Sequence, residues 1–278
     1  MLTQLMMVVS PMSCLFSPYL LKDVTLRNRI VASSMCQYLA RDGLLNEWHQ
    51  AHYETVAKGG VGLVVVEATA VSHRGLITLG DAGLWNDSQV PSFALVAHAI
   101  NNAGAVAGIQ IDHAGRKAGC TPPWEGGAPL PESDPQACQP LAPSALPYIP
   151  DAGHIPSEIT REEILRTQQE FAHAAARALE AGFEWLELHF AHGFLGQSFL
   201  SRQANIRTDQ YGGSLENPAR FFIETVAAVK QFWPSNLPLT VRLGVVEFGQ
   251  FAEASVIDSI QVLRWLKAVG TTIREHKV

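Results

Sequence analysis

Short runs of apolar, β-branched residues alternate along the chain with longer segments of helical periodicity. The run at 62–67 (GLVVVE) is almost entirely apolar, which is typical of a parallel strand buried on both faces. Runs of the same kind predict further strands at 29–34, 106–111, 183–189 and 239–244. The patterns between them predict helices at 46–58, 90–103, 160–181, 217–232 and 252–268. This alternation predicts right-handed βαβ units and a parallel sheet.

Local signals agree with these boundaries. Thr160 and Glu163 have the spacing of a capping box, in which each side chain bonds the other residue's backbone at a helix N-terminus. Gly182 follows the predicted end of that helix, as glycine often does. The pattern lapses at 115–156, where prolines and glycines are frequent. We expect this stretch to be an insertion after the third strand that caps the active site.

The composition indicates a large globular interior and excludes some classes of function. Of 278 residues, 47% are hydrophobic and 17% are charged, below the roughly 25% that is usual. This apolar share excludes an intrinsically disordered chain. The formal net charge is −6, and there is no run of Lys or Arg, so we expect no nucleic-acid partner. No uninterrupted apolar window reaches the roughly 18 residues of a membrane span, so we expect no membrane partner either.

The cysteines and the length narrow the interpretation further. Four cysteines are too few for a disulfide framework and have no C-x-x-C spacing, which favours a reducing, cytoplasmic location. Residues 1–13 lack a basic start, and we expect a disordered leader there. The length is sufficient in total for a (β/α)₈ barrel, which takes roughly 250 residues. The pattern supplies about five βα units once the leader and the insertion are set aside.

Two histidines follow the fourth predicted strand. Side chains alternate along a strand, so Trp185, Glu187 and His189 share one face. His189 then lies at the carboxyl end of the strand, where parallel α/β folds place their chemistry, and His192 lies just beyond. Two imidazoles can hydrogen-bond an oxygen and stabilise negative charge that develops on it. A metal pair without an evident third ligand and a purely structural pair are the competing interpretations.

Other polar residues lie at or near strand ends. Cys36 and Tyr38 follow the first strand, and Gln110 closes the third. Taken singly, these residues are more often structural than functional, and a cysteine alone is more often a small buried hydrophobe. Arg242 is the stronger candidate, because a guanidinium inside an apolar strand must meet an acceptor or an anion.

Five segments, taken together and in this order, resemble the Old Yellow Enzyme family of flavin-dependent ene-reductases, in particular its bacterial-type, thermophilic-like branch. They are 15–28 (LFSPYLLKDVTLRN), 35–38 (MCQY), 108–117 (GIQIDHAGRK), 184–193 (EWLELHFAHG) and 207–217 (RTDQYGGSLEN). The resemblance implies a (β/α)₈ TIM barrel that holds FMN at the carboxyl ends of its strands. It implies an NADPH dehydrogenase that passes hydride to activated alkenes such as enones and nitroalkenes. It also allows a homo-oligomer for a full-length chain.

The resemblance implies roles for residues around the substrate. His189 and His192 are similar to the pair that grips the carbonyl or nitro oxygen of the alkene. Tyr38 is similar to a hydroxyl of the substrate pocket. Arg116 resembles a residue at the pocket rim or in a structural position, to which the resemblance assigns no chemistry.

The resemblance also implies a flavin site. Gln110 and Arg242 are similar to the partners of the flavin pyrimidine edge, where a positive charge stabilises the anionic reduced ring. Cys36 is similar to the residue near flavin N5 that adjusts its potential. Met35 and Ala68 are similar to flavin-contacting positions.

Phe194 departs from the family's pattern. The pattern places Tyr two residues after the second histidine, as the acid that protonates the α-carbon. Phenylalanine has no proton to donate, and general acid catalysis is typically worth about 10²–10⁴-fold. We therefore expect a weakened reaction with the alkene, whereas reduction of the flavin by NADPH does not need this acid.

The end of the sequence is the second departure. After Gly270 the chain reads TTIREHKV, where the resemblance calls for an apolar sixth strand. We expect 14–270 to form a partial barrel domain and 271–278 to be an unrelated tail. The units that bind the FMN phosphate in the family would then be absent. The alternative expectation is a non-catalytic, truncated product that cannot bind FMN stably.

Overall fold

A computed structural model describes residues 14–131, 133–134, 137–149, 155–248 and 251–273. The predicted leader at 1–13 therefore lies outside the described residues, as do residues 274–278. None of the described helices is both long enough and apolar enough to cross a membrane.

A seven-stranded sheet forms the centre of the molecule, and its neighbouring strands run parallel. Six strands follow one another across the sheet in chain order: β3 (Val31–Ala32), β4 (Leu63–Ala70), β6 (Val106–Asp112), β9 (Trp185–Phe190), β10 (Leu239–Leu243) and β11 (Thr272–Ile273). The short β5 (Ala82–Gly83) pairs with the end of β4. Chain-order neighbours are typical of a βα barrel, whereas a doubly wound sheet reverses its order. The predicted parallel α/β fold is confirmed.

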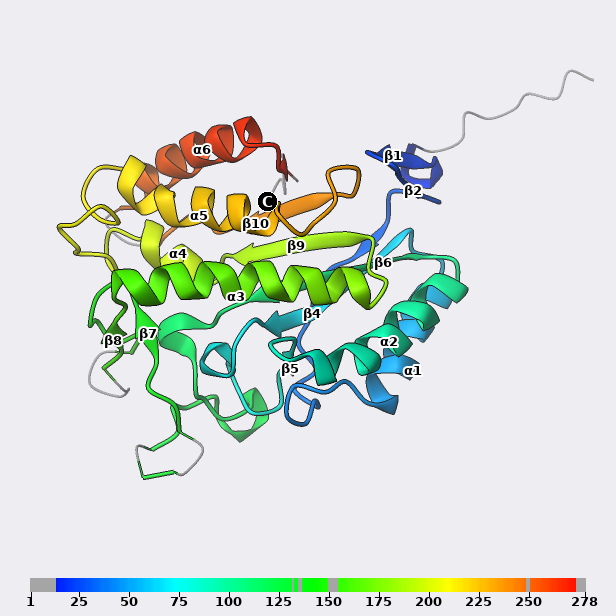
Figure 1. Ribbon diagram of the computed structural model, residues 1–278, viewed down its shortest axis with the longest axis horizontal. Helices are drawn as coiled ribbons and strands as arrows, with labels where there is room; N and C mark the ends of the chain where they lie inside the picture. The colour runs from blue at the N-terminus through cyan, green and yellow to red at the C-terminus, as the bar shows by residue number, and fades with distance from the viewer. Residues whose placement is uncertain (1–13, 132, 135–136, 150–154, 249–250, 274–278) are drawn as a thin grey trace, which may run out of the picture.

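Five main helices connect the strands and lie along the sheet, as Figure 1 shows. They are α1 (Glu47–Lys58), α2 (Val90–Asn102), α3 (Arg161–Glu180), α5 (Glu216–Val229) and α6 (Ala252–Ala268). All five match predicted helices to within a few residues. The longest shows why it packs as it does: Ile164, Phe171, Ala175 and Ala178 recur at helical spacing and are fully buried against the sheet.

The capping box at the start of α3 is confirmed. The Thr160 hydroxyl accepts the Glu163 backbone N–H at 3.1 Å, and the Glu163 carboxylate accepts the Thr160 N–H at 3.0 Å. Arg74 adds an ion pair to Glu163 at 3.2 Å. These partners hold the pKa of Glu163 below its usual range, with the Thr160 N–H as the largest cause.

A hairpin that the hydrophobic pattern did not predict packs against the start of the sheet. Its strands β1 (Tyr19–Leu21) and β2 (Val24–Leu26) are antiparallel and contain three residues each. Val24 and Leu26 are buried against Leu63 and Trp185, at the amino ends of β4 and β9. The hairpin therefore covers the end of the sheet opposite the candidate site.

The last strand corrects the sequence analysis. Thr272 and Ile273 pair in parallel with Thr240 and Val241 of β10, so these two residues continue the sheet and the predicted unrelated tail is wrong for them. A two-residue strand is held by backbone hydrogen bonds, which an apolar pattern does not reveal. The described sheet has six strands in chain order, not five.

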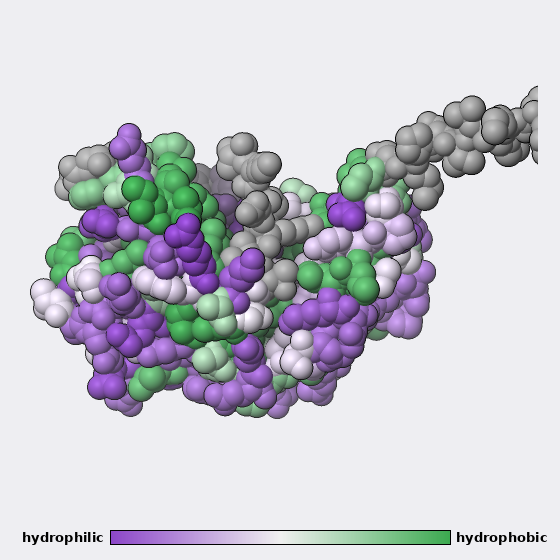
Figure 2. Space-filling view, turned by 90° about the horizontal axis from the view of Figure 1, so that it is seen from above, coloured by the Kyte–Doolittle hydropathy of each residue, from purple (hydrophilic) through white to green (hydrophobic). Residues whose placement is uncertain are grey.

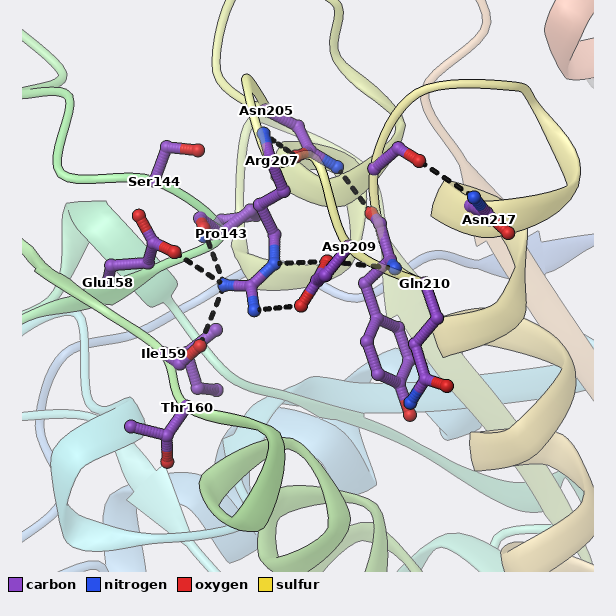
Figure 3. Close-up of polar contacts among 12 residues, drawn as sticks. Pro143, Ser144, Glu158, Ile159, Thr160, Asn205, Arg207, Asp209, Gln210 and Asn217 are labelled. Carbon is purple, nitrogen blue, oxygen red and sulfur yellow. Dashed lines mark hydrogen bonds and ion pairs between the residues drawn. The ribbon is translucent and has the colours of Figure 1, made fainter.

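The insertion at 115–156 is tied to the segment that follows the short helix α4 (Leu195–Leu200). Its short strand β7 (Leu141–Ala142) pairs with β8 (Ser157–Glu158). Arg207 joins these parts, because its guanidinium donates to the carbonyls of Pro143 and Ile159 at 2.9 and 2.8 Å. The same guanidinium bonds both oxygens of Asp209, at 3.0 and 2.6 Å (Figure 3).

Five one-turn 3₁₀ helices complete the described elements: Cys14–Phe16, His73–Gly75, Asp87–Gln89, Gly115–Lys117 and Pro123–Glu125.

Candidate active site

The two predicted histidines lie side by side at the carboxyl end of β9. His189 is almost fully buried, and His192 is partly exposed in a left-handed turn with φ of 58°, completed by Gly193. The His192 Nδ1 and the His189 Nε2 are 3.1 Å apart, and the rings meet edge to face. The other nitrogen of His189, Nδ1, is buried and has no partner among the described residues.

Two cations adjoin this pair. Arg242 of β10 is in register with His189, and the Lys117 ammonium donates to the His192 carbonyl at 2.6 Å. Burial lowers the pKa of His189 well below its ordinary value, and His192, Arg242 and Lys117 lower it further. Partial burial, Arg242 and Lys117 lower the pKa of His192. Both imidazoles are therefore neutral near pH 7 and lie in a positive field, which suits a ligand oxygen that gains negative charge.

Arg242 has the free donor capacity that its sequence context predicted. Its guanidinium, half-buried at the end of β10, makes no hydrogen bond or ion pair with any residue in the described part of the chain. A strand-borne guanidinium without a protein partner fits a site for an acceptor supplied by a ligand.

Gln110 of β6 lies in a buried chain of hydrogen-bonded side chains that joins β9 to the segment after β3. Its amide nitrogen donates to Glu187 of β9 at 2.7 Å, and its amide oxygen accepts the Ser34 hydroxyl at 3.0 Å. The amide plane is thus fixed, and one N–H remains for a ligand. Ala68 lies opposite Gln110, because a register shift in β4 after Val66 turns it into that position.

The segment that contains Met35, Cys36 and Tyr38 follows β3 and is held by a hydrogen bond to Glu67 of β4. The Glu67 carboxylate, fully buried, accepts the Gln37 backbone N–H at 2.8 Å. Tyr38 has a φ of 54°, a strained value for a residue with a Cβ. Met35 is 61% exposed at the carboxyl end of the sheet, so it is available to a ligand there.

The Cys36 thiol remains protonated in this setting. Burial raises its pKa, and the carboxyls of Asp81, Asp112 and Glu67 raise it further. The side chain is therefore a neutral hydrogen-bonding group and not a thiolate nucleophile. Burial also raises the pKa of Tyr38, whose hydroxyl stays protonated.

Phe194 lies where the family's acid was expected. It caps the start of α4 and is 8% exposed, with its ring centroid 5.0 Å from that of His189 and 6.3 Å from that of His192. The aromatic ring fills this part of the site without offering a proton.

The structure thus brings together the site residues predicted from sequence, at the carboxyl ends of neighbouring strands. The sequence placed Glu67 at the end of the second predicted strand but assigned no role to Glu67 or Lys117. A carboxylate within an apolar strand must find buried donors, and that signal points to Glu67. Lys117 ends a quoted motif, but its contact with His192 depends on the fold. No group of three or more metal-binding side chains occurs within the described ranges.

Comparisons with known proteins agree with this geometry. A family model described as the NADH:flavin oxidoreductase / NADH oxidase family matches residues 14–277. An NADPH dehydrogenase from Bacillus velezensis is 43% identical over 261 residues, which cover 93% of this chain and 71% of that protein.

Solved structures show the same fold. Morphinone reductase in complex with tetrahydroNAD has a TM-score of 0.79 at 28% identity, covering 93% of this chain and 72% of that one. An Old Yellow Enzyme homologue from Zymomonas mobilis has a TM-score of 0.78 at 26% identity, covering 92% of this chain and 71% of that one. The alternative expectation of a non-catalytic product gains no support from these matches.

Proposed function

Because the chain belongs to the NADH:flavin oxidoreductase / NADH oxidase family, we propose that it reduces the carbon–carbon double bond of activated alkenes such as enones and nitroalkenes. It is an oxidoreductase with FMN as cofactor and NADPH as hydride donor. The observation that carries the proposal is the neutral histidine pair beside two cations, Arg242 and Lys117.

The residues present fit the isoalloxazine ring of FMN. The unpartnered Arg242 guanidinium and the remaining N–H of Gln110 would bind its pyrimidine edge, and Met35, Cys36 and Ala68 would contact the ring. When bound, FMN supplies a hydride that it has taken from NADPH. Arg242 would offset the negative charge of the reduced ring.

The histidine pair would orient and activate the substrate. The His189 Nε2 and the His192 Nδ1, which face each other at 3.1 Å, would each donate an N–H to the carbonyl or nitro oxygen of the alkene in place of the contact between the two rings. Negative charge grows on that oxygen when hydride adds to the β-carbon, and fixed donors stabilise it without reorganising. Arg242 and Lys117 would strengthen the effect, because both lower the pKa of the pair and favour an anion beside it. The Tyr38 hydroxyl would line the substrate pocket.

Anaerobic rapid mixing of the FMN-loaded protein tests the proposal. We expect NADPH to bleach the flavin and an enone to restore its colour. Removing one such donor typically costs about 10²–10³-fold, so His189→Ala and His192→Ala should slow the recolouring by about that factor. Bleaching by NADPH should persist in both variants. His173→Ala, which removes an exposed histidine of α3, is the matched control and should leave both steps unchanged. Recolouring at the original rate in both site variants would refute the assigned role.

We also propose a cytoplasmic location. All four cysteines are free thiols, which supports a reducing compartment. The partners of the reaction would be NADPH and a small alkene.

A further inference from the structure

A cavity of about 180 Å³ lies between the segment that ends at Tyr38 and the insertion. A cavity of roughly 150 Å³ takes a benzene molecule, so this one has room for a group of about one ring. Six of the fourteen lining residues are aliphatic: Ile77, Ala118, Pro123, Pro129, Pro140 and Ile149. Such a lining favours a ligand with an apolar body, whose orientation the polar lining residues determine.

Arg116 is the first of these polar groups. Its guanidinium lines the cavity, and its Nε is buried without a hydrogen-bond partner among the described residues. No carboxylate among the described residues lies within ion-pair distance of the Arg116 guanidinium. The Tyr148 ring, 5.8 Å from the guanidinium carbon, provides a cation–π contact but no acceptor. A buried donor without an acceptor is costly, so this side chain fits a ligand that brings one.

Lys117 connects the cavity to the histidine pair. Its ammonium lies 4.1 Å from the centroid of the Tyr148 ring and donates to the His192 carbonyl at 2.6 Å. Lys117 therefore lines the cavity and also contacts His192, so the cavity lies next to the histidine pair.

The negative groups nearby do not neutralise these cations. No Asp or Glu of the described ranges is among the cavity-lining residues. Asp81 lies behind the wall, where its oxygens accept the Thr78 hydroxyl at 2.9 Å and the Ile77 N–H at 2.6 Å. Glu247 favours the charged form of Arg116 from a distance, but its carboxylate accepts the Ser201 hydroxyl. Among the described residues, the cavity therefore presents two positive charges without a paired counter-charge.

We infer that this cavity binds an anionic end of the alkene substrate. The ligand class is an enone whose ring-sized apolar body ends in a carboxylate, with the carboxylate at Arg116 and the carbonyl oxygen at the histidine pair. Guanidinium and carboxylate match in charge and geometry, and their hydrogen bonds are among the stronger ones in proteins. The inference rests on the proposed function.

Calorimetry can test binding apart from turnover. The probes are 4-carboxybenzylideneacetone and its methyl ester, which are similar in shape but differ in charge. Without NADPH no hydride reaches the alkene, so the FMN-loaded protein only binds them. We expect the acid to bind at least about tenfold more tightly than the ester, as one charge-assisted hydrogen bond provides. Arg116→Gln should abolish this preference and leave binding of the ester unchanged.

Two further variants sharpen the test. Arg116→Lys keeps the charge and should retain part of the preference, which preserves the test if Arg116→Gln does not fold. Arg264→Gln removes an exposed arginine of α6 and should change nothing. Equal binding of acid and ester by the original protein, or a preference that survives Arg116→Gln, overturns the inference.

Turnover distinguishes this inference from the proposed function. If the ester binds but NADPH does not reduce it, the proposed function fails while the charge preference stands. If acid and ester bind alike and Arg116→Gln raises only the KM for NADPH, the anion is a phosphate of the nicotinamide cofactor. The substrate inference is then wrong.

Discussion

The ring of Phe194 occupies the position where a proton donor would serve the proposed reaction. It is packed beside His189 and against Ala114 and Ala118, so the ring of a tyrosine in its place would lie beside the pair. We expect Phe194→Tyr to accelerate alkene-dependent recolouring of the reduced protein by about 10²–10⁴-fold, the usual contribution of a general acid. Stopped-flow absorbance measures this rate.

Two comparisons make that result specific. Bleaching by NADPH needs no proton from this position and should stay constant in Phe194→Tyr. Phe199→Tyr adds the same hydroxyl to a buried ring of α4 and serves as the control for a hydroxyl elsewhere. An unchanged recolouring rate in Phe194→Tyr would show that the missing acid does not limit the reaction.

Glu67 connects residue chemistry to the pH dependence of stability. Burial is the largest cause that raises its pKa, to about 7, although the Gln37 N–H and the Tyr53 hydroxyl both stabilise the carboxylate. A carboxyl with a raised folded-state pKa binds its proton more tightly when folded. Protonated Glu67 therefore stabilises the folded protein. This stabilisation is complete below the pKa that Glu67 has in the unfolded chain, and it is lost as the pH rises toward about 7.

We therefore compare Glu67→Gln with the original protein between pH 5 and pH 8. The glutamine cannot ionise, so the Tm of Glu67→Gln relative to the original should rise with pH across this range. Asp81 titrates in both proteins. His49 lies 3.4 Å from the Glu67 carboxylate, but burial lowers its pKa to about 4, so it stays neutral across this range. Glu54→Gln removes an exposed carboxylate paired with Lys58 and should show no such trend. A flat difference for Glu67→Gln would mean that Glu67 is ionised throughout.

Some residues of the site could be predicted from the sequence and others could not, for a physical reason. His189 and Arg242 were identified because polar groups at the ends of apolar strands need partners, and the strands themselves are legible in the sequence. The roles of Ser34 and Tyr53 depend on contacts 76 and 14 residues away in the chain. Which hydroxyl meets which acceptor is set by the register of the sheet, and a single sequence does not reveal that register.

At the scale of elements, Arg207 links the insertion at 115–156 to the segment that follows α4. Its side chain is 6% exposed and bonds two carbonyls and Asp209 together. Hydrogen bonds to charged groups are worth more than neutral ones, so Arg207→Gln should lower the free energy of unfolding by about 2–3 kcal/mol. Urea denaturation measures this loss.

Arg166→Gln is the matched control for that loss. Arg166 is 54% exposed and pairs with Glu163 and Glu170 on the surface of α3. Exposed pairs are typically worth less than about 1 kcal/mol. Equal losses in the two variants would show that the burial of Arg207 adds nothing.

Elements were predictable where their periodicity was long. The main helices extend over three or more turns, and α1 and α3 begin with capping boxes, so the buried stripes of these helices can be read from the sequence. The strands β1, β2 and β11 contain two or three residues each, too few for any periodicity to show. They exist because backbone groups pair with a neighbour already in place, which is a tertiary effect.

At the scale of the molecule, chain-order pairing of parallel strands places Gln110, His189 and Arg242 near the carboxyl ends of three neighbouring strands, β6, β9 and β10. The strand–helix alternation in the sequence already implies this arrangement. The tail was misread because Gly270, with φ of 88°, ends α6 with a turn that feeds β11 directly. The Thr271 hydroxyl donates to the Leu266 carbonyl and fixes that turn.

The outer face of α6 carries apolar side chains, and hydrophobic residues gather over this part of the molecule in Figure 2. Ile257 is 68% and Ile260 44% exposed, one turn apart on the side away from the buried Val262 and Leu266. Contiguous exposed apolar surface promotes association in water. We expect Ile257→Lys with Ile260→Lys to reduce concentration-dependent light scattering, and to change the free energy of unfolding by less than about 0.5 kcal/mol. Leu165→Lys alters an exposed leucine of α3 instead and should leave scattering unchanged. Equal scattering by the original protein and the double variant would show that this face does not drive association.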